Sequence, residues 1–350
     1  MPKKLRVLVV DDSSFMRKIL TEMIDSDPEC KVIKAATDGV EALKAVEELR
    51  PDVVTMDIEL PEIDGLTCIA YIMEEFPTPI VVVTGFSEFM GDETIKALEY
   101  GAVGLVRKPR GLISRNMREI KKGLLSQIKL ASTVDIRKLK PVKEKKAIKK
   151  VARPVPKSTN KIVAIAASSG GPRALAQVIP MLPADLPAGV LVVQHIPAEF
   201  VSSLAERLNL GSALDVKVIE ELDSVQQGRI LFAPGDFHCR IESKEKDGEL
   251  IKLAPIPREK HHPLCAADKL MISLAPIYGK NAVGVVLTGM GDDGTKGLGA
   301  IKKYGGCTIA EDESTCVVYG MPRSAIQAGV ADKVVPLNKV ADEIIKAVKR

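Results

Sequence analysis

Short apolar runs rich in β-branched residues recur along the amino-terminal part of the chain and alternate with helical patterns. These runs cover residues 7–10, 51–56, 80–83 and 102–106. Between the first two, apolar side chains from Phe15 to Ile24 recur at helical spacing. Continuous apolar runs of this length are typical of parallel strands that are buried on both faces. The pattern predicts a doubly wound α/β domain.

The same alternation resumes in the carboxy-terminal half of the chain. Apolar runs at 161–166, 190–193 and 283–287 are separated by helical or turn-rich stretches. Such alternation is typical of a mostly parallel sheet covered by helices. At 350 residues the chain is also too long for one ordinary core. We therefore expect two doubly wound α/β domains.

A basic, proline-containing segment separates the two series of strands. Residues 137–157 include ten Lys or Arg and one acidic residue, Glu144. This segment has a net charge of +9, so the rest of the chain, within a total of +4, is mildly acidic. The composition is that of a solvated, self-repelling linker. We predict domains at residues 1–125 and 161–350 joined by a linker at 126–160, which is either a plain spacer or a docking patch for an acidic partner surface.

The overall composition narrows the function classes. Hydrophobic residues make up 46% of the chain, whereas aromatic residues make up 3% and tryptophan is absent. The cores must therefore be aliphatic, and aromatic platforms for single-stranded nucleic acid are not expected. The cysteines are scattered without zinc-ligand spacing, which favours reduced core thiols. They are Cys30, Cys68, Cys239, Cys265, Cys307 and Cys316.

The chain start is basic, but the apolar run that follows stops at Asp11, too early for a signal peptide. No later run approaches the length of a membrane span. We expect a cytoplasmic protein with no membrane insertion.

Polar side chains follow the predicted strands of the first domain. Asp11 and Asp12 end the first run, Asp57 ends the second, Thr84 ends the third and Lys108 follows the fourth. Ligands bind at such strand ends in open α/β sheets. Three gathered carboxylates repel one another and need a cation, and all-oxygen ligands suit Mg²⁺. A phosphoryl group on Asp57 would be neutralised by Mg²⁺ and Lys108 and hydrogen-bonded by Thr84.

These residues, with Pro61 and the Asp64–Gly65 turn, resemble the receiver domain of two-component response regulators, which has a flavodoxin-like fold. The resemblance covers about residues 1–125. It implies that Asp57 accepts a phosphoryl group from the phosphohistidine of a chemotaxis histidine kinase.

The resemblance also assigns the metal ligands. It implies that Asp12, Asp57 and the Glu59 backbone carbonyl bind Mg²⁺ directly, while Asp11 acts mostly through water. One position departs from the family: Leu105 stands where many receivers carry an aromatic switch residue. The alternative reading is that Asp11 and Asp12 merely cap the following helix.

A serine, a histidine and an aspartate follow strands of the second domain. Ser168 follows the run at 161–166, His195 follows the run at 190–193, and Asp293 lies in the glycine-rich segment after 283–287. The three residue types are those of a nucleophile, a general base and an orienting carboxylate. The G-x-S-x-G elbow of α/β-hydrolases is absent. Backbone N–H groups at the glycines after Ser168, or around Met290, are candidates for the oxyanion hole.

Five segments together resemble the catalytic domain of the chemotaxis protein-glutamate methylesterases, a Rossmann-like domain with a mostly parallel sheet. The resemblance spans residues 161–345 or so. The segments are Ala167–Pro172, Gln194–Pro197, Ala233–Asp236, Leu287–Gly294 and Cys316–Pro322.

The resemblance implies a reaction and a role for each residue. Ser168 is the nucleophile, His195 the general base and then acid, Asp293 the orienting carboxylate, and Met290 gives its backbone N–H to the oxyanion. The implied reaction is hydrolysis of glutamyl methyl esters on methyl-accepting chemotaxis receptors, releasing methanol, with deamidation of receptor glutamines as a second activity. It needs no cofactor; Mg²⁺ serves the receiver.

Two neighbours compete for these roles. Ser169 is a rival nucleophile on spacing alone, although we expect it to cap a helix. Asp292 is the rival of Asp293 and is expected to face solvent. Residues 261–263, His-His-Pro, lie where the family usually has a basic residue before proline in a substrate-side loop, and the loop that follows is longer than usual.

The sequence thus favours an esterase gated by phosphorylation of its receiver. A receiver-controlled transcriptional regulator is the alternative, but the second domain shows no helix-turn-helix or basic recognition face, and no nucleic-acid partner is expected. A dinucleotide-binding enzyme ranks lower, because residues 168–171 lack the G-x-G-x-x-G spacing.

Overall fold

The structure, a computed structural model, divides the chain into two compact units, and each is considered by itself. The amino-terminal unit spans Met1–Val142 and the carboxy-terminal unit spans Lys143–Arg350. The structure describes residues 4–85, 90–108, 117–136, 139, 157–220, 223–235, 237–242, 252–257 and 266–350. Most of the basic segment at 137–157, and the histidines at 261 and 262, lie outside these residues.

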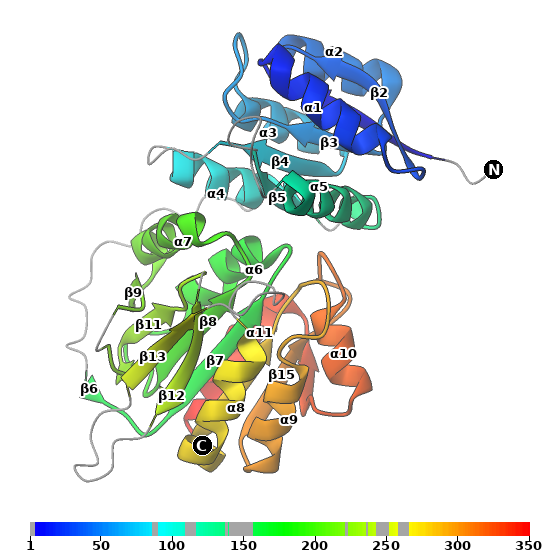
Figure 1. The fold of residues 1–350 in the computed structure, drawn as a ribbon. Coiled ribbons are helices and arrows are strands. Elements are labelled where there is room, and N and C mark those ends of the chain that lie inside the picture. The colour runs from blue at the N-terminus through cyan, green and yellow to red at the C-terminus, as the bar shows by residue number, and fades with distance from the viewer. Residues whose placement is uncertain are drawn as a thin grey trace. The chain divides into compact units, whose positions relative to one another are not determined.

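The amino-terminal unit is a five-stranded parallel sheet with the strand order β2-β1-β3-β4-β5 (Figure 1). Helices α1 and α5 pack together, and α2, α3 and α4 form a second contacting series, so both faces are covered. The elements are β1 (Leu5–Val10), α1 (Ser14–Asp25), β2 (Cys30–Ala36), α2 (Gly39–Leu49), β3 (Val53–Met56), α3 (Gly65–Glu75), β4 (Ile80–Thr84), α4 (Met90–Tyr100), β5 (Gly104–Arg107) and α5 (Met117–Ala131).

The local sequence accounts for these elements. Every residue of β3 and β4 is buried, as expected of central parallel strands with continuous apolar runs. Helices α2 and α3 begin at aspartate caps, because Asp38 accepts a hydrogen bond from the Glu41 amide and Asp64 accepts one from the Thr67 amide.

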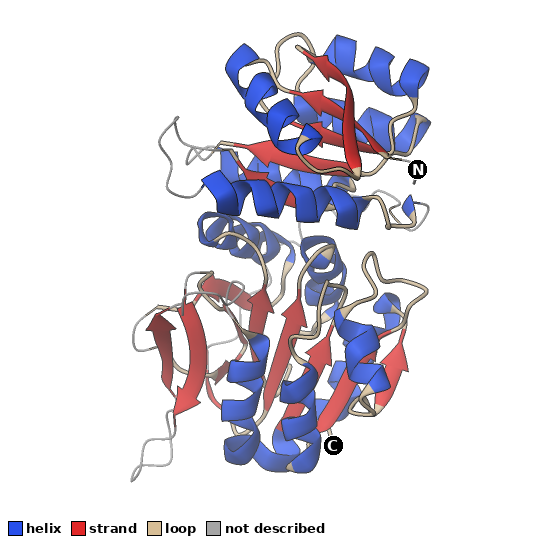
Figure 2. Ribbon diagram, turned by 45° about the vertical axis from the view of Figure 1, so that its right-hand side comes forward, coloured by secondary structure: helices blue, strands red, loops and turns tan. Residues whose placement is uncertain are grey.

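The carboxy-terminal unit is built on a seven-stranded sheet of order β16-β15-β14-β7-β8-β11-β9, in which all paired strands are parallel. Figure 2 shows helices on both sides of this sheet. Its elements are β6 (Lys157–Ser158), β7 (Ile162–Ala167), α6 (Gly171–Val178), η2 (Ile179–Met181), β8 (Gly189–Gln194), α7 (Ala198–Gly211), β9 (Asp215–Val218), β10 (Gln226–Gln227), β11 (Arg229–Phe232), β12 (Phe237–Glu242), β13 (Lys252–Pro257), α8 (Ala267–Tyr278), η3 (Gly279–Asn281), β14 (Ala282–Val286), α9 (Thr295–Lys303), β15 (Cys307–Glu311), α10 (Met321–Gln327), β16 (Lys333–Val335) and α11 (Leu337–Val348).

Two helix layers enclose the carboxy-terminal sheet. Helices α8, α9 and α10 pack against β14 and its neighbours, while α6 and α11 pack against each other and α11 also contacts β7. Strands β7, β8 and β14 are fully buried and carry aliphatic side chains, in keeping with the low aromatic content. The prediction of two doubly wound α/β domains is confirmed.

Described helix and strand residues lie within both ends of the predicted linker, and the domain bounds stay a prediction. Helix α5 continues to Ala131, because Leu124, Ile128 and Ala131 form a buried stripe that carries the helix past residue 125. Near the other end of the predicted linker, β6 pairs with β10 in an antiparallel ribbon. Helix α5 therefore enters the segment 126–160 from one side, and β6 lies near its other end.

Two further predictions concern the residues that the structure describes. None of their helices has the length and apolar character that a membrane span requires. Five described cysteines are free, and all except Cys307 are fully buried, as expected of core thiols.

Candidate functional site

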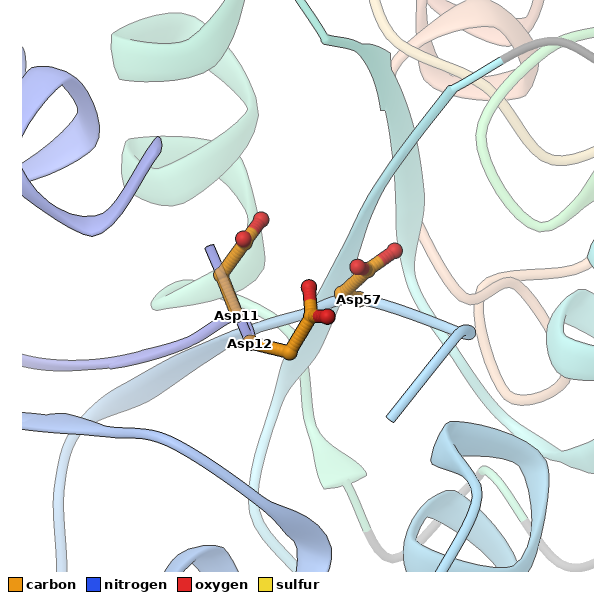
Figure 3. A group of neighbouring side chains, drawn as sticks. All are labelled: Asp11, Asp12 and Asp57. Carbon is orange, nitrogen blue, oxygen red and sulfur yellow. The ribbon is translucent and has the colours of Figure 1, made fainter. Parts of the chain in front are cut away.

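The sheet of the amino-terminal unit brings three aspartates together. Strands β1 and β3 are neighbours at the point where the strand order changes direction, the usual place for a ligand in such a fold. Asp11 and Asp12 follow β1, and Asp57 follows β3 (Figure 3). One ligand oxygen from each of the three lies within 4.8 Å of the others. Asp11 and Asp57 are buried, whereas Asp12 is exposed.

Lys108, just after β5, is the cation of this cluster. Its Nζ lies 2.7 Å from Asp11 Oδ2 and 2.5 Å from Asp57 Oδ2. Burial raises the pKa of Asp57 to about 6, even though Lys108 opposes the shift, and the charge of Asp11 adds to it. Burial would lower the pKa of Lys108, but the two carboxylates raise it. One ammonium among three carboxylates leaves excess negative charge at this strand edge.

The donor set fits a divalent cation. The three carboxylates offer oxygen only, and the exposed Asp12 leaves an approach for water, which suits Mg²⁺. Thr84 at the end of β4 is fully buried, and its hydroxyl has no hydrogen-bond partner within the described part of the chain. A buried hydroxyl that has no partner within the protein is suited to form a hydrogen bond with a bound ligand. Glu59 is exposed in the loop after β3.

The loop before α1 and the turn before α3 each have a local structural explanation. The N-cap of α1 is Ser13 and not an aspartate, because the Ser13 side chain accepts a hydrogen bond from the Met16 amide. The Ser13 amide in turn donates to Asp11 Oδ1. Capping therefore does not account for Asp12. A side chain at Gly65 would meet the Asp57 carbonyl oxygen at 2.1 Å, so the turn that returns the chain to α3 requires glycine. Leu105 is half-buried on β5.

The carboxy-terminal unit also gathers polar residues after neighbouring parallel strands, although its sheet has a different strand order. Strand β7 has β8 on one side and β14 on the other. The Ser168 amide donates to the Thr288 carbonyl over 3.0 Å, and the His195 amide donates to the Ala167 carbonyl over 2.9 Å. The ends of these strands therefore hold Ser168, His195 and the segment after β14 at one edge of the sheet.

His195 and Asp293 are in direct contact, although 98 positions separate them. His195 Nε2 lies 2.9 Å from Asp293 Oδ2. Because Nε2 contacts Asp293, Nδ1 is the ring nitrogen left to accept a proton from a nucleophile. The structure records no hydrogen bond between the ring and the Ser168 hydroxyl, both of which are described. Such contacts often tighten only when substrate is bound.

Asp293 is held as a carboxylate. Burial alone would raise its pKa, but the contact with His195 and hydrogen bonds from backbone amides lower it. The amides of Ala267 and Asp268 donate to it over 2.7 and 2.9 Å. An ionised Asp293 fixes the tautomer in which Nε2 of His195 carries the proton.

Gln194, which the sequence analysis did not assign a role, ties two of the strand ends together. Its side-chain Nε2 donates to the Ser168 carbonyl over 2.9 Å and to the His195 carbonyl over 3.2 Å. The side chain is 3% exposed. A side chain at Gly171 would meet Gln194 Oε1 at 2.0 Å, so this glycine makes room for the amide. The sequence signal that could have identified Gln194 is its position as a polar residue at the end of an otherwise apolar strand.

The structure shows how Ser169 and Asp292, the neighbours of Ser168 and Asp293, are placed. Helix α6 begins at Gly171, and its N-cap is Gly170, which makes no side-chain hydrogen bond to the helix. The expectation that Ser169 caps a helix is therefore wrong. Ser169 instead accepts a hydrogen bond from the Thr288 hydroxyl at its carbonyl. A left-handed glycine, with φ of 79°, turns the chain there and leaves no role for a hydroxyl cap. Asp292 is exposed, as expected.

Backbone N–H groups lie open next to the serine. Met290 is 52% exposed, and its amide donates to no acceptor in the described segments. A side chain at Gly289 would meet Ser168 Cβ at 2.6 Å, so the segment after β14 lies close to the serine.

His238 is fully buried, and its Nδ1 accepts a hydrogen bond from the Ala266 amide.

Comparisons with known proteins identify a family for each of the two units. Residues 163–344 match the family model "CheB methylesterase", and residues 7–115 match the model "Response regulator receiver domain". A protein-glutamate methylesterase/protein-glutamine glutaminase of Pyrococcus horikoshii is 45% identical over 354 residues, which cover 100% of this chain and 95% of the relative. The enzyme of the same description from Thermotoga maritima is 43% identical and is covered to 98%, as is this chain.

A solved structure is similar to the carboxy-terminal unit. The CheB methylesterase catalytic domain of Thermotoga maritima is 44% identical, with a TM-score of 0.51, and the match covers 53% of this chain and 97% of that domain. A parallel α/β receiver unit with an acidic cluster at one edge of its sheet is followed by a methylesterase unit with serine, histidine and aspartate after its strands. This combination defines a response regulator whose output domain is an enzyme. The chain belongs to the CheB methylesterase family. A DNA-binding output is accordingly not favoured.

Proposed function

We propose that this protein is a phosphorylation-activated protein-glutamate methylesterase of chemotaxis that also deamidates receptor glutamines. Its substrates are methyl-accepting chemotaxis receptors, and its phosphodonor is a chemotaxis histidine kinase. The observation that carries the hydrolase assignment is the contact between His195 and Asp293 beside Ser168 at adjacent strand ends. Relatives described as methylesterase and glutaminase, aligned over the whole chain, support the reaction.

The chemistry follows from the positions of three side chains. Ser168 Oγ attacks the carbonyl carbon of the glutamyl ester and gives its proton to His195 Nδ1, while Asp293 stabilises the imidazolium through Nε2. The Met290 amide donates to the developing oxyanion. The imidazolium then returns its proton to the leaving methoxide, which departs as methanol.

A water molecule completes the cycle by attacking the acyl-serine, with His195 again as base, and releases glutamate. With a glutamine substrate the same steps expel ammonia in place of methanol. No cofactor takes part in either reaction, since the nucleophile, the base and the oxyanion donor all belong to the chain.

The amino-terminal unit is the control input of this enzyme. Asp57 accepts the phosphoryl group, Lys108 neutralises its oxygens and the unpartnered Thr84 hydroxyl donates to it. Asp12, Asp57 and the Glu59 carbonyl would hold Mg²⁺, with Asp11 acting through water. The bound cation supplies positive charge that offsets the repulsion between carboxylates and phosphoryl oxygens. The receiver at residues 1–125, the linker and the catalytic domain at 161–350 form one regulated chain located in the cytoplasm.

Methanol release from receptor membranes carrying labelled glutamyl methyl esters tests the proposal. We expect acetyl phosphate with Mg²⁺ to increase the rate of the wild type and Asp57→Asn to remove that increase while a basal rate remains. Ser168→Ala should abolish release, and Ser169→Ala should not. Retention of activity by Ser168→Ala would refute the mechanism. Equal rates with and without phosphodonor in the wild type would refute the gating.

A further inference from the structure

The aspartate that contacts His195 is part of a reciprocal arrangement between two helices. Asp293 directly precedes the start of α9, yet its carboxylate accepts from the amides of Ala267 and Asp268, the first two residues of α8. Asp268, in the first turn of α8, accepts in turn from the amides of Gly294 and Gly297 at the start of α9. Each aspartate therefore satisfies the amino-terminal amides of the other helix.

Neither helix has a cap of its own. The N-cap positions are Ala266 for α8 and Gly294 for α9, and neither makes a side-chain hydrogen bond to its helix. The first amides of a helix have no partner within the helix and are costly to leave unsatisfied when buried. Asp268 and Asp293 supply these partners across the pair, so the start of one helix fixes the start of the other.

The helices are close enough for this exchange because α9 carries glycine at the contact. A side chain at Gly297 would meet Met271 Cβ, on α8, at 2.5 Å. Burial and the neighbouring Asp293 raise the pKa of Asp268, while the amides of Gly297 and Gly294 oppose the shift. The repulsion between two adjacent carboxylates is thus offset by the amide dipoles of both helix starts.

The Gly294 amide is the link to catalysis. It donates to Asp268 Oδ1 over 2.9 Å and to Asp293 Oδ1 over 3.1 Å. Asp268 therefore holds the peptide bond that joins Asp293 to Gly294, where the backbone has a φ of 93°. The position of this turn decides where the Asp293 carboxylate meets the imidazole.

We propose that Asp268 is a positioning residue of the methylesterase, which acts on the reaction by fixing the Asp293 turn through a hydrogen bond to the Gly294 amide. The inference rests on the proposed roles of Ser168, His195 and Asp293. Asp268 has no recorded contact with His195 or Ser168 and contributes no atom to the reaction. Displacement of a catalytic group by about 1 Å can lower a rate on the order of 100-fold.

Asp268→Ala in the full-length chain removes the acceptor but keeps the backbone amide that donates to Asp293. We expect kcat for methanol release, measured with acetyl phosphate and Mg²⁺ over a range of labelled receptor membranes, to fall about tenfold or more. KM should change less than about twofold, because substrate contacts are intact. Asp268→Asn keeps an oxygen that can accept from both amides, so it should restore kcat to within about threefold of the wild type.

A matched control separates positioning from general stability. Asp332 likewise accepts from a backbone amide, that of Thr308 over 3.1 Å, but at the amino end of β15, the opposite end from the site. Asp332→Ala should leave kcat unchanged. If Asp268→Ala retains full kcat, if Asp268→Asn is as slow as the alanine variant, or if Asp332→Ala is equally slow, the proposal is wrong.

Two further variants keep the experiment decisive. Asp268→Glu serves if Asp268→Ala fails to fold, because it retains the charge but displaces the carboxylate oxygen. We expect this variant to lose kcat. A wild-type kcat in Asp268→Glu would overturn the positioning role. Ser168→Ala tests the underlying mechanism. Activity in that variant would refute the proposed triad, whereas an inactive Ser168→Ala beside a fully active Asp268→Ala would refute the positioning role alone.

Discussion

The two sites contain a buried aspartate, Asp57, and a half-buried one, Asp293, whose pKa values move in opposite directions. Asp57 and Asp293 both follow parallel strands near the place where the strand order changes direction. The pKa of Asp57 is raised to about 6, whereas the pKa of Asp293 is lowered. Desolvation raises both, so burial alone does not decide the outcome.

The two pKa values differ because different groups compensate the negative charges of Asp57 and Asp293. Asp57 has the Lys108 ammonium and the Ile58 amide, but Asp11 adds a like charge beside it. Asp293 has an imidazole and amides from two helix starts. The charge of Asp57 is thus less fully compensated, which suits its proposed roles as phosphoacceptor and cation ligand. Asp293 is kept charged, which suits its proposed role of stabilising an imidazolium.

The strongest test of this contrast is Asp293→Asn. An amide cannot stabilise the imidazolium and favours the wrong tautomer, so kcat for methanol release should fall by about 10³- to 10⁴-fold. The neighbouring Asp292→Asn is the matched control, because Asp292 is exposed and should keep wild-type kcat. Comparable losses in both variants would contradict the assignment of Asp293.

The second test addresses the connection between strand ends in the hydrolase. Gln194→Met keeps the length of the side chain but removes the donor shared by the Ser168 and His195 carbonyls. We expect kcat to fall on the order of 10- to 100-fold, because serine and imidazole lose their common constraint. Gln227→Met, on the two-residue strand β10, should leave kcat unchanged. A wild-type rate for Gln194→Met would show that backbone pairing alone aligns the two residues.

The third test uses the raised pKa of Asp57. Because the folded pKa of about 6 exceeds the ordinary aspartate value of 3.8, the folded receiver binds a proton more tightly than the unfolded chain. Its stabilising contribution is present below about pH 4 and is lost as the pH rises through about 6. In the absence of Mg²⁺, we expect Asp57→Asn to remove this loss and to raise the free energy of unfolding at pH 7 by about 1–3 kcal/mol.

Urea unfolding at pH 4, 6 and 8 without Mg²⁺ measures the effect. The wild type and Asp57→Asn should converge near pH 4, diverge between about pH 4 and 6, and differ by a constant amount above about pH 6. Parallel curves, or a wild type that gains stability relative to the variant as the pH rises, would contradict an under-compensated Asp57.

The smallest expected effect concerns an aspartate cap away from both sites. Asp38 caps α2 by accepting from the Glu41 amide over 2.8 Å. Asp38→Ala should lower the free energy of unfolding of the receiver by about 1 kcal/mol. Methanol release by the phosphorylated protein should not change. A loss of kcat similar to that expected for Asp268→Ala would show that cap removal affects activity through stability rather than through position.

Much of this architecture could be predicted from the sequence. Continuous apolar runs identified the central strands, and the polar residues that close them included the members of the acidic cluster and both partners of the His195–Asp293 contact. Carboxyl ends of parallel strands share one edge of a sheet, so residues remote in sequence converge there without further information. The end of the first domain stays a prediction, and the sequence pattern did not show that the buried stripe of α5 runs past residue 125.

The sequence by itself determined the two folds, the edge of each sheet where chemistry occurs and the residue types gathered there, because strand periodicity and strand-end polarity are local properties of the chain. Only the tertiary structure decided which ring nitrogen of His195 meets Asp293, that Gln194 joins two strand ends, and that Asp268 and Asp293 cap each other's helices. These contacts depend on strand register and on the approach of α8 to α9. Such long-range packing also gives Asp57 and Asp293 opposite pKa shifts, since the compensating groups come from distant parts of the chain.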